Sequence, residues 1–305
     1  MNSSRESRLT GLVAATHTPF DSSGALNLSI VEKQAEHLLR HDIHAAFTGG
    51  STGESHSLAY EERRRLAERW LEVARGSELK VVVHVGSNSL AEARQLAEQA
   101  GVLGAHAISM LCPSYYKPPS LEALVACCAE VASAAPETPF YYYDIPALTG
   151  VHFSMPRFME LAAKALPNFA GLKYTNFDLG EFQLCRAVPG NYEVLWGVDE
   201  FYLAALALGA NGGVGSTYNF APRLAQEIEQ GFKNGHLEAA RSAQLRLVQL
   251  VQALARFGYL PAAKALMSML GVDVGAARLP LQALTAGQAS ELRTELETLG
   301  YFDWI

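Results

Sequence analysis

The fold is decided by residues 45–85, AAFTGGSTGESHSLAYEERRRLAERWLEVARGSELKVVVHV. This stretch opens with a short apolar run, Ala45–Phe47, and closes with another, Val81–Val85. Between them, apolar side chains recur at the i, i+4, i+7 and i+8 positions of an amphipathic helix, namely Leu66, Trp70, Val73 and Ala74. Continuous apolar strands separated by a helix are typical of a parallel sheet that is covered on both faces.

The same alternation continues in both directions along the chain. The apolar runs are Leu12–Ala15, Ala45–Phe47, Val81–Val85, Ala107–Leu111, Phe140–Tyr143, Ala170–Tyr174, Val194–Trp196 and Gly212–Val214. Eight such strands in 305 residues predict an α/β fold of the (β/α)8 TIM barrel type. A doubly wound open sheet is the alternative, but no GxGxxG motif follows a strand and opens a helix.

Beyond the eighth run the chain continues in helical segments to Ile305, with no linker rich in Pro, Gly or Ser. The apolar positions of the first segment are Leu245, Val248, Val251 and Leu254. We therefore expect a single domain over residues 1–305, with a barrel core at about 10–220 and a C-terminal helical extension at about 221–305.

The composition limits the classes of function. Hydrophobic residues make up 49% of the chain and charged residues 18%, which excludes wholesale disorder. The formal net charge is -7 and no basic run occurs, so we expect neither nucleic acid nor an anionic membrane as a partner. The longest apolar run, Phe201–Ala210, is about half of the roughly 20 residues that a membrane-spanning helix needs.

Two features predict a cytoplasmic protein. The opening stretch MNSSRESRLT is polar and has no apolar core after it, so we expect no secretory signal. Cys112, Cys127, Cys128 and Cys185 form no CxxC pair, and a few scattered cysteines in a large chain indicate a reducing compartment.

We expect no metal site. The nine histidines are scattered and form neither HxH nor HExxH. His84 alone lies within an apolar run, where a histidine with satisfied hydrogen bonds in the core is the better interpretation.

Because barrel enzymes carry their chemistry at the carboxyl ends of the strands, polar residues at the ends of the apolar runs are the site candidates. In FAGLKYTN, residues 169–176, strand alternation places Lys173 on one face with Gly171 and Thr175. A lysine desolvated inside the barrel has a lowered pKa and can attack a carbonyl carbon as the free amine. A lysine paired with a buried carboxylate, or one that reaches solvent, is the alternative.

Three further strand ends supply polar groups. Tyr143 ends the run in PFYYYDIPALTG and could exchange protons with a substrate hydroxyl. The alternative is that the aromatic side chains of this run, Tyr142 and Tyr141 first, only fill the barrel and helix layers. In GGSTGES, Ser51 and Thr52 could bind a substrate carboxylate, or they could cap a tight turn.

The runs before WGVDE and GGVGSTYN end close to Asp199, Glu200 and Ser216. Asp199 and Glu200 could bind a polyhydroxylated substrate or take part in acid–base chemistry. One of the two carboxylates could instead cap a helix, since a negative charge is favourable at a helix N-terminus.

Five motifs in this order resemble the N-acetylneuraminate lyase and dihydrodipicolinate synthase superfamily. They are GSTGE at Gly50–Glu54, YYYDIPALTG, GLKYT, GVDE and GSTYN, and the resemblance runs from about Leu12 into the C-terminal part. It implies a pyruvate-handling class I aldolase without a cofactor. In such enzymes the residue matching Lys173 forms an imine with a 2-oxo acid, that matching Tyr143 relays a proton, and those matching Ser51 and Thr52 hold the carboxylate.

The subgroup depends on fewer residues. Dihydrodipicolinate synthases carry an arginine five positions after the tyrosine, where this chain has Leu148 and therefore no cationic fork for a second carboxylate. PALTG and the DE pair look instead like sialic acid lyases, which cleave N-acetylneuraminate to N-acetylmannosamine and pyruvate. In these, the polyhydroxylated tail is bound by residues that match Thr175, Gly197, Asp199, Glu200 and Ser216.

The sequence is also compatible with other functions. Another pyruvate aldolase or a dehydratase of the superfamily, acting on a 2-keto-3-deoxy sugar acid, would share Lys173 and Tyr143. A metal-dependent aldolase and a non-enzymatic binding barrel are further alternatives. Tyr115 and Tyr116 match a double tyrosine that lies near the site and the neighbouring subunit in relatives, which are commonly homotetramers; here the pair could equally pack at a loop.

Overall fold

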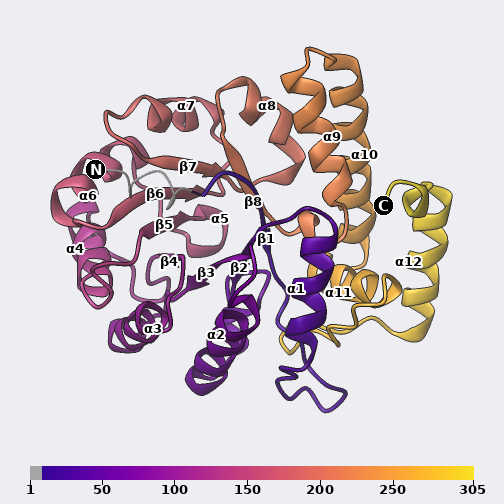
Figure 1. Ribbon diagram of the computed structural model, residues 1–305, viewed down its shortest axis with the longest axis horizontal. Coiled ribbons are helices and arrows are strands. Elements are labelled where there is room, and N and C mark those ends of the chain that lie inside the picture. The colour runs from indigo at the N-terminus through magenta and orange to yellow at the C-terminus, as the bar shows by residue number, and fades with distance from the viewer. Residues whose placement is uncertain (1–8) are drawn as a thin grey trace.

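The computed structural model describes residues 9–305, so the first eight residues of the stretch examined for a secretory signal lie outside it. Within these residues eight parallel strands form a closed barrel in chain order, which confirms the predicted (β/α)8 TIM barrel (Figure 1). The strands are β1 (Gly11–Ala15), β2 (Ala45–Thr48), β3 (Lys80–His84), β4 (Ala107–Met110), β5 (Phe140–Asp144), β6 (Phe169–Tyr174), β7 (Glu193–Trp196) and β8 (Gly212–Gly215). The barrel closes where β1 pairs with β8.

Helices surround the strands in the order that the hydrophobic periodicity predicts (Figure 1). They are α1 (Ile30–Arg40), α2 (Tyr60–Ala74), α3 (Leu90–Val102), α4 (Leu121–Ala132), the short α5 (Pro146–Thr149), α6 (Met155–Ala165), α7 (Leu179–Ala187), α8 (Tyr202–Ala207) and α9 (Pro222–Lys233). In α2 the predicted apolar positions Leu66 and Trp70 are buried. Gly76, just past its end, has the left-handed φ of +79° that commonly terminates a helix.

Strand alternation separates two layers of buried side chains. Tyr141 and Tyr143 belong to the cluster that fills the barrel, whereas Tyr142 packs outward against Phe158 of α6. Glycine is required at Gly171, because a Cβ there would lie 1.8 Å from the backbone oxygen of Glu193 on the neighbouring strand.

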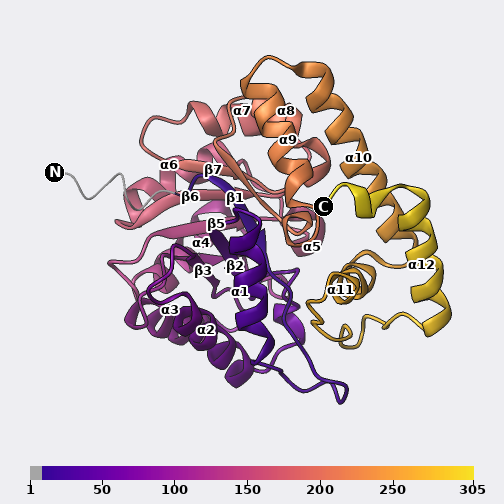
Figure 2. The ribbon, with the colours of Figure 1, turned by 45° about the vertical axis from the view of Figure 1, so that its right-hand side comes forward.

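The C-terminal helical extension is also confirmed, with α10 (Leu237–Arg256), α11 (Tyr259–Met269) and α12 (Ala286–Thr298) on one side of the barrel (Figure 2). Its core-facing residues differ in part from the expected ones. Leu247, Leu250 and Leu254 are buried in α10, whereas Leu245 is 58% exposed. These side chains share one buried cluster with the barrel helices, and a boundary at about residue 220 stays a prediction.

Three further observations concern the described residues. None of the helices within 9–305 is both long and apolar enough to cross a membrane. No group of three or more His, Cys, Asp or Glu side chains in this part of the chain is arranged to hold a metal ion. The four cysteines are free, and Cys127 alone is not fully buried.

Candidate active site

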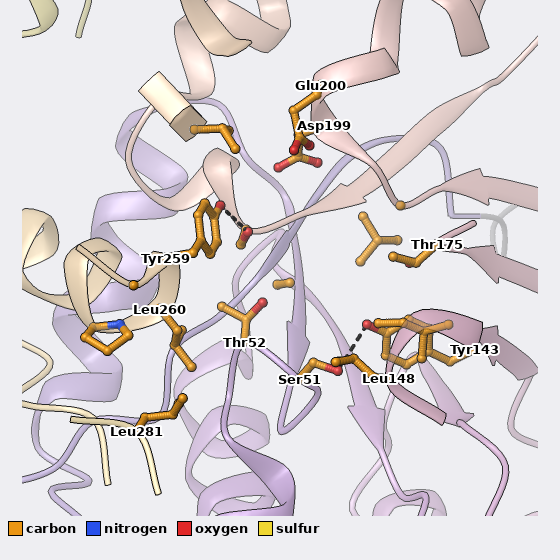
Figure 3. Close-up of a pocket in the computed structure, with 18 of the residues that line it drawn as sticks. Ser51, Thr52, Tyr143, Leu148, Thr175, Asp199, Glu200, Tyr259, Leu260 and Leu281 are labelled. Atoms are coloured by element: carbon orange, nitrogen blue, oxygen red, sulfur yellow. Dashed lines mark hydrogen bonds between the residues drawn. The ribbon is translucent and has the colours of Figure 1, made fainter. Parts of the chain in front are cut away.

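A cavity of about 880 Å³ opens at the carboxyl ends of the strands. This is the end at which barrel enzymes place their chemistry. The cavity brings together every residue that the sequence singles out as a site candidate: Ser51, Thr52, Tyr143, Lys173, Thr175, Gly197, Asp199, Glu200 and Ser216. Figure 3 shows Asp199 and Glu200 on one side of it and Tyr143 and Ser51 on the other.

Lys173 lies on β6, directly beside Tyr143 of β5 in the strand register. Its Nζ is 4.1 Å from the centre of the Phe47 ring and 4.0 Å from that of Tyr143. The residue is only 4% exposed, so it does not reach bulk solvent. Burial lowers the pKa of Lys173 to about 7, and the negative charge of Asp199 acts against this shift. A large fraction of the side chain is therefore the nucleophilic free amine near neutral pH.

Tyr143 is linked to the turn after β2. Its hydroxyl lies 3.2 Å from Ser51 Oγ, within hydrogen-bonding distance, as the dashed line in Figure 3 marks. Burial raises the pKa of Tyr143 to about 12, and the Ser51 hydrogen bond opposes that shift. The phenol is thus protonated at neutral pH, with a second hydroxyl beside it to which a proton can pass.

The turn that carries Ser51 and Thr52 is tight. Gly49 has a φ of +67°, and a Cβ on Gly53 would lie 3.0 Å from the backbone nitrogen of Gly49. The hydroxyl of Ser51 bonds Tyr143, and α2 begins only after Ala59, so Ser51 does not cap that helix. Both hydroxyls line the cavity instead.

Asp199 is buried at the end of β7. Its Oδ2 accepts hydrogen bonds from the backbone nitrogen of Thr217 at 3.0 Å and from Thr217 Oγ1 at 2.6 Å. Among residues 9–305, no group hydrogen-bonds Oδ1. Burial raises the pKa of Asp199 to about 6, and the Thr217 hydrogen bonds oppose the shift. Asp199 therefore fixes the start of the loop after β8, while its second carboxylate oxygen is buried without a hydrogen-bond partner among the described residues.

Two glycines leave room for this arrangement. A Cβ on Gly197 would lie 2.0 Å from Thr175 Oγ1, and a Cβ on Gly215 would lie 2.0 Å from Asp199 Oδ1. Ser216 Oγ is 2.7 Å from the hydroxyl of Tyr259, a residue of α11. The polar side of the cavity is thus held in place by close contacts between different strand ends.

Sequence reasoning missed the wall that the C-terminal extension contributes. It consists of Val251, Phe257, Gly258, Tyr259, Leu260, Pro261, Pro280, Leu281 and Gln282. Figure 3 shows Tyr259, Leu260 and Leu281 facing the cavity from the side opposite Thr175. The only local signal is the break RFGYLP between two helical segments, which says nothing of where those helices pack.

Three residues that the sequence analysis considered outside this set, His84, Tyr115 and Tyr116, do not line the cavity. His84 is a core histidine, as interpreted from the sequence: Arg63 and the backbone nitrogen of Leu111 lie at its ring nitrogens, each at 3.4 Å. Tyr115 and Tyr116 are 78% and 85% exposed and do not line the cavity. Their rings pack edge to face on each other.

Two further residues of the YYYDIPALTG motif, Asp144 and Leu148, lie close to the site residues. Leu148 lines the cavity and is 67% exposed. Asp144, which follows Tyr143 at the end of β5, is buried, and Asn176 Nδ2 donates to its Oδ2 at 3.4 Å. Burial raises the pKa of Asp144 to about 7, and Asn176 opposes the shift.

The structure is a closed (β/α)8 barrel, and the buried Lys173 of its sixth strand lines a cavity at the carboxyl ends of the strands. These two features place the protein in the class of (β/α)8 barrels that carry their site at this end. Within that class the chain belongs to the dihydrodipicolinate synthetase family, which its sequence matches over residues 8–299. The resemblance drawn from the motifs is therefore confirmed.

Within the family, the chain is similar to N-acetylneuraminate lyases. It is 40% identical to the Xenopus tropicalis N-acetylneuraminate lyase over 293 residues, which cover 95% of this chain and 96% of that protein. The Rattus norvegicus N-acetylneuraminate lyase is 36% identical over 304 residues, covering 97% and 94%. The solved structure of the Proteus mirabilis N-acetylneuraminate lyase is 36% identical, covers 96% of this chain and 99% of its own, and superposes with a TM-score of 0.93.

Proposed function

We propose that this protein is a class I aldolase that cleaves N-acetylneuraminate to N-acetylmannosamine and pyruvate. The observation that carries the proposal is the position of Lys173, a buried amine with a pKa of about 7 beside the hydroxyl pair of Tyr143 and Ser51. The names of relatives that cover nearly the whole chain support the choice of substrate. Leu148, at the place of the synthase arginine, argues against a substrate with a second carboxylate there.

The two ends of the substrate contact opposite sides of the cavity. Ser51 and Thr52 donate hydrogen bonds to the carboxylate, next to Lys173. The hydroxyl-rich tail reaches the opposite side, where Asp199 Oδ1 has no hydrogen-bond partner among residues 9–305 and Glu200 is partly exposed. Buried acceptors of this kind favour a polyhydroxylated ligand, because a ligand without hydroxyls would leave them unpaired.

The bond breaks after an imine has formed. The free amine of Lys173 adds to the C2 ketone of the open-chain sugar acid. The hydroxyl of the adduct then leaves as water with the proton of the Tyr143 phenol, which gives a protonated imine that withdraws electrons and a phenolate that can accept the next proton. The C4 hydroxyl then gives up its proton through the substrate carboxylate toward Tyr143 and Ser51, the C3–C4 electron pair moves to the imine, and N-acetylmannosamine leaves. The phenol of Tyr143 supplies a proton to C3 of the enamine, and hydrolysis of the imine releases pyruvate and restores Lys173.

We also propose a cytoplasmic homotetramer that interacts with small molecules. The four free cysteines support a reducing compartment. The exposed Tyr115–Tyr116 pair offers an aromatic surface of the kind that subunit interfaces bury. Sedimentation analysis tests the assembly, and a mass of one 33.0 kDa chain rather than four would refute it.

The deciding experiment measures pyruvate release from N-acetylneuraminate by the wild-type protein and by Lys173→Ala. We expect release by the wild type alone, because each of the other lysines lies outside the cavity. If Lys173→Ala kept about a tenth of wild-type activity or more, far above the loss expected for a covalent nucleophile, Lys173 would not be the imine-forming residue. If the wild type instead acted only on 2-keto-3-deoxy sugar acids, the substrate part of the proposal would be wrong.

A further inference from the structure

Glu54 closes the turn that carries Ser51 and Thr52, yet the proposed reaction gives it no role. Its backbone nitrogen donates to the carbonyl of Ser51 at 3.0 Å. Its φ is +53°, a left-handed conformation that residues other than glycine adopt only when their surroundings hold them there. The residue is 5% exposed and does not line the cavity, so its carboxylate contacts protein rather than substrate.

Each carboxylate oxygen of Glu54 binds a different part of the C-terminal extension. Oε1 accepts from Lys264 Nζ of α11 at 2.8 Å, and both side chains of this ion pair are only 1% exposed. Oε2 accepts from the backbone nitrogen of Arg278 at 2.8 Å. Lys264 Nζ also donates to the carbonyls of Thr18 at 3.0 Å and Ala276 at 3.1 Å, so its three protons are used.

The side chain of Arg278 extends this network to the barrel. Its guanidinium donates to both carboxylate oxygens of Glu62 on α2, at 2.7 and 2.5 Å. It also donates to the carbonyls of Ser57 at 3.1 Å and Gly24 at 2.8 Å. The ring of Phe20 contacts both cations, with its centre 4.3 Å from Lys264 Nζ and 4.0 Å from the guanidinium carbon of Arg278.

The three segments that meet at Glu54 also supply three walls of the cavity. The turn supplies Ser51 and Thr52, the first turn of α11 supplies Tyr259 to Pro261, and the residues after Arg278 supply Pro280 to Gln282. Figure 3 shows Thr52, Leu260 and Leu281 from these segments around one space. Because Glu54 and Lys264 are fully buried, a displacement that separated them would leave two desolvated charges unpaired, so this ion pair and the hydrogen bond from the Arg278 nitrogen hold the three walls together.

We propose that Glu54 is a positioning residue for the aldolase reaction, which with Lys264 and Arg278 aligns the carboxylate-binding turn with the C-terminal wall that faces the sugar. This inference rests on the proposed function. It predicts that substitutions at different points of the network change the half-saturating concentrations of pyruvate and of N-acetylmannosamine separately.

The first test is Glu54→Gln, which keeps the shape of the side chain and removes its charge. Pyruvate is trapped on Lys173 with borohydride over a range of pyruvate concentrations. We expect the half-saturating concentration to rise about tenfold or more, because a displacement of about 1 Å in a positioning group can cost as much as 10²-fold. Trapping at saturation should stay at the wild-type level in the folded protein, whereas a purely structural role would lower the folded fraction and leave the half-saturating concentration unchanged.

The second test is Arg278→Ala, which guards against a Glu54→Gln protein that does not fold. This variant keeps the backbone bond from residue 278 to Glu54 and removes the guanidinium contacts to Glu62, Ser57 and Gly24. In the condensation of pyruvate with N-acetylmannosamine, we expect the half-saturating concentration of the sugar to rise about tenfold and that of pyruvate to change by less than about twofold. Arg94→Ala is the control, because Arg94 forms an ion pair with Glu130 on the outer helices.

The outcomes separate the two proposals. Wild-type protein that traps no pyruvate would overturn the proposed function and this inference with it. Wild-type trapping, together with folded Glu54→Gln and Arg278→Ala proteins that bind pyruvate and N-acetylmannosamine as the wild type does, would overturn the inference alone. An effect of Arg94→Ala equal to that of Arg278→Ala would also overturn it.

Discussion

At the scale of the residue, the chemistry of Lys173 depends on where the barrel places it. A lysine in water has a pKa near 10.5, and burial between the rings of Phe47 and Tyr143 lowers that of Lys173 to about 7. The sequence locates this lysine, because an apolar strand with one cation in its middle allows few alternatives. A second buried lysine, Lys264, was not foreseen, since its partner Glu54 lies 210 positions away in the chain.

The shifted pKa predicts how imine formation depends on pH. Only the unprotonated amine attacks, so the rate of pyruvate trapping should rise from pH 6, reach half of its maximum at about pH 7 and level off above pH 8. The initial trapping rate at saturating borohydride measures this dependence. A rate that keeps rising through pH 9 would show that Lys173 titrates as an ordinary lysine.

Replacing Tyr143 by Phe removes one hydroxyl and leaves the ring that packs on Phe47 and Lys173. We expect turnover of N-acetylneuraminate to fall by the roughly 10²–10⁴-fold typical of a lost acid–base group. Trapping of pyruvate at saturation should persist, because the amine is still present. Near-normal turnover would remove Tyr143 from the mechanism.

At the scale of the element, the strands and the amphipathic helices were predictable, and several of the segments that join them were not. The predicted runs lie within or next to every strand of the barrel, because a strand buried on both faces needs a continuous apolar run. Neither the short helix α5 nor residues 270–285, between α11 and α12, show a continuous apolar run or a helical repeat of apolar residues from which their structure could be predicted. The position of residues 270–285 depends on Arg278, which contacts Glu62 and Gly24 far away in the chain.

The ends of neighbouring strands are packed so closely that adding one methyl group tests whether their spacing matters for substrate binding. In Gly197→Ala the new Cβ would lie 2.0 Å from Thr175 Oγ1 and 3.0 Å from the carbonyl of Tyr174, so Thr175 must move. We expect KM for N-acetylneuraminate to rise about tenfold or more, while half-saturation by pyruvate changes little.

Gly287→Ala on α12 is the matched control. The new Cβ would meet only Thr285 Oγ1, at 3.9 Å, and should leave KM unchanged. If both glycine variants behaved like the wild type, Thr175 would not contribute to sugar binding.

At the scale of the whole molecule, the C-terminal extension is part of the same core as the barrel. Leu296 of α12 is fully buried, and the hydroxyl of Tyr301 donates to the carbonyl of Phe220 just before α9. Leu296→Ala should lower the free energy of unfolding by about 2–5 kcal/mol, the cost of a cavity in a packed core. Urea unfolding measures this value.

Leu184→Ala is the comparison for that measurement, because Leu184 lies on α7 and is 62% exposed. It should change the free energy of unfolding by less than about 0.5 kcal/mol, as surface substitutions usually do. Equal effects of the two substitutions would mean that α12 is not packed on the rest of the molecule as described.

The pairing of β1 with β8 has a consequence for the protein while it is being made. The first strand leaves the ribosome early, but the strand that completes its hydrogen bonds ends only at Gly215. At roughly 5–20 residues per second, β1 waits on the order of ten seconds or more with one unpaired edge. Glu54 waits longer still, until Lys264 and Arg278 have emerged. A nascent chain thus acquires a complete cavity only near the end of its synthesis, because Pro280, Leu281 and Gln282 are part of the cavity lining.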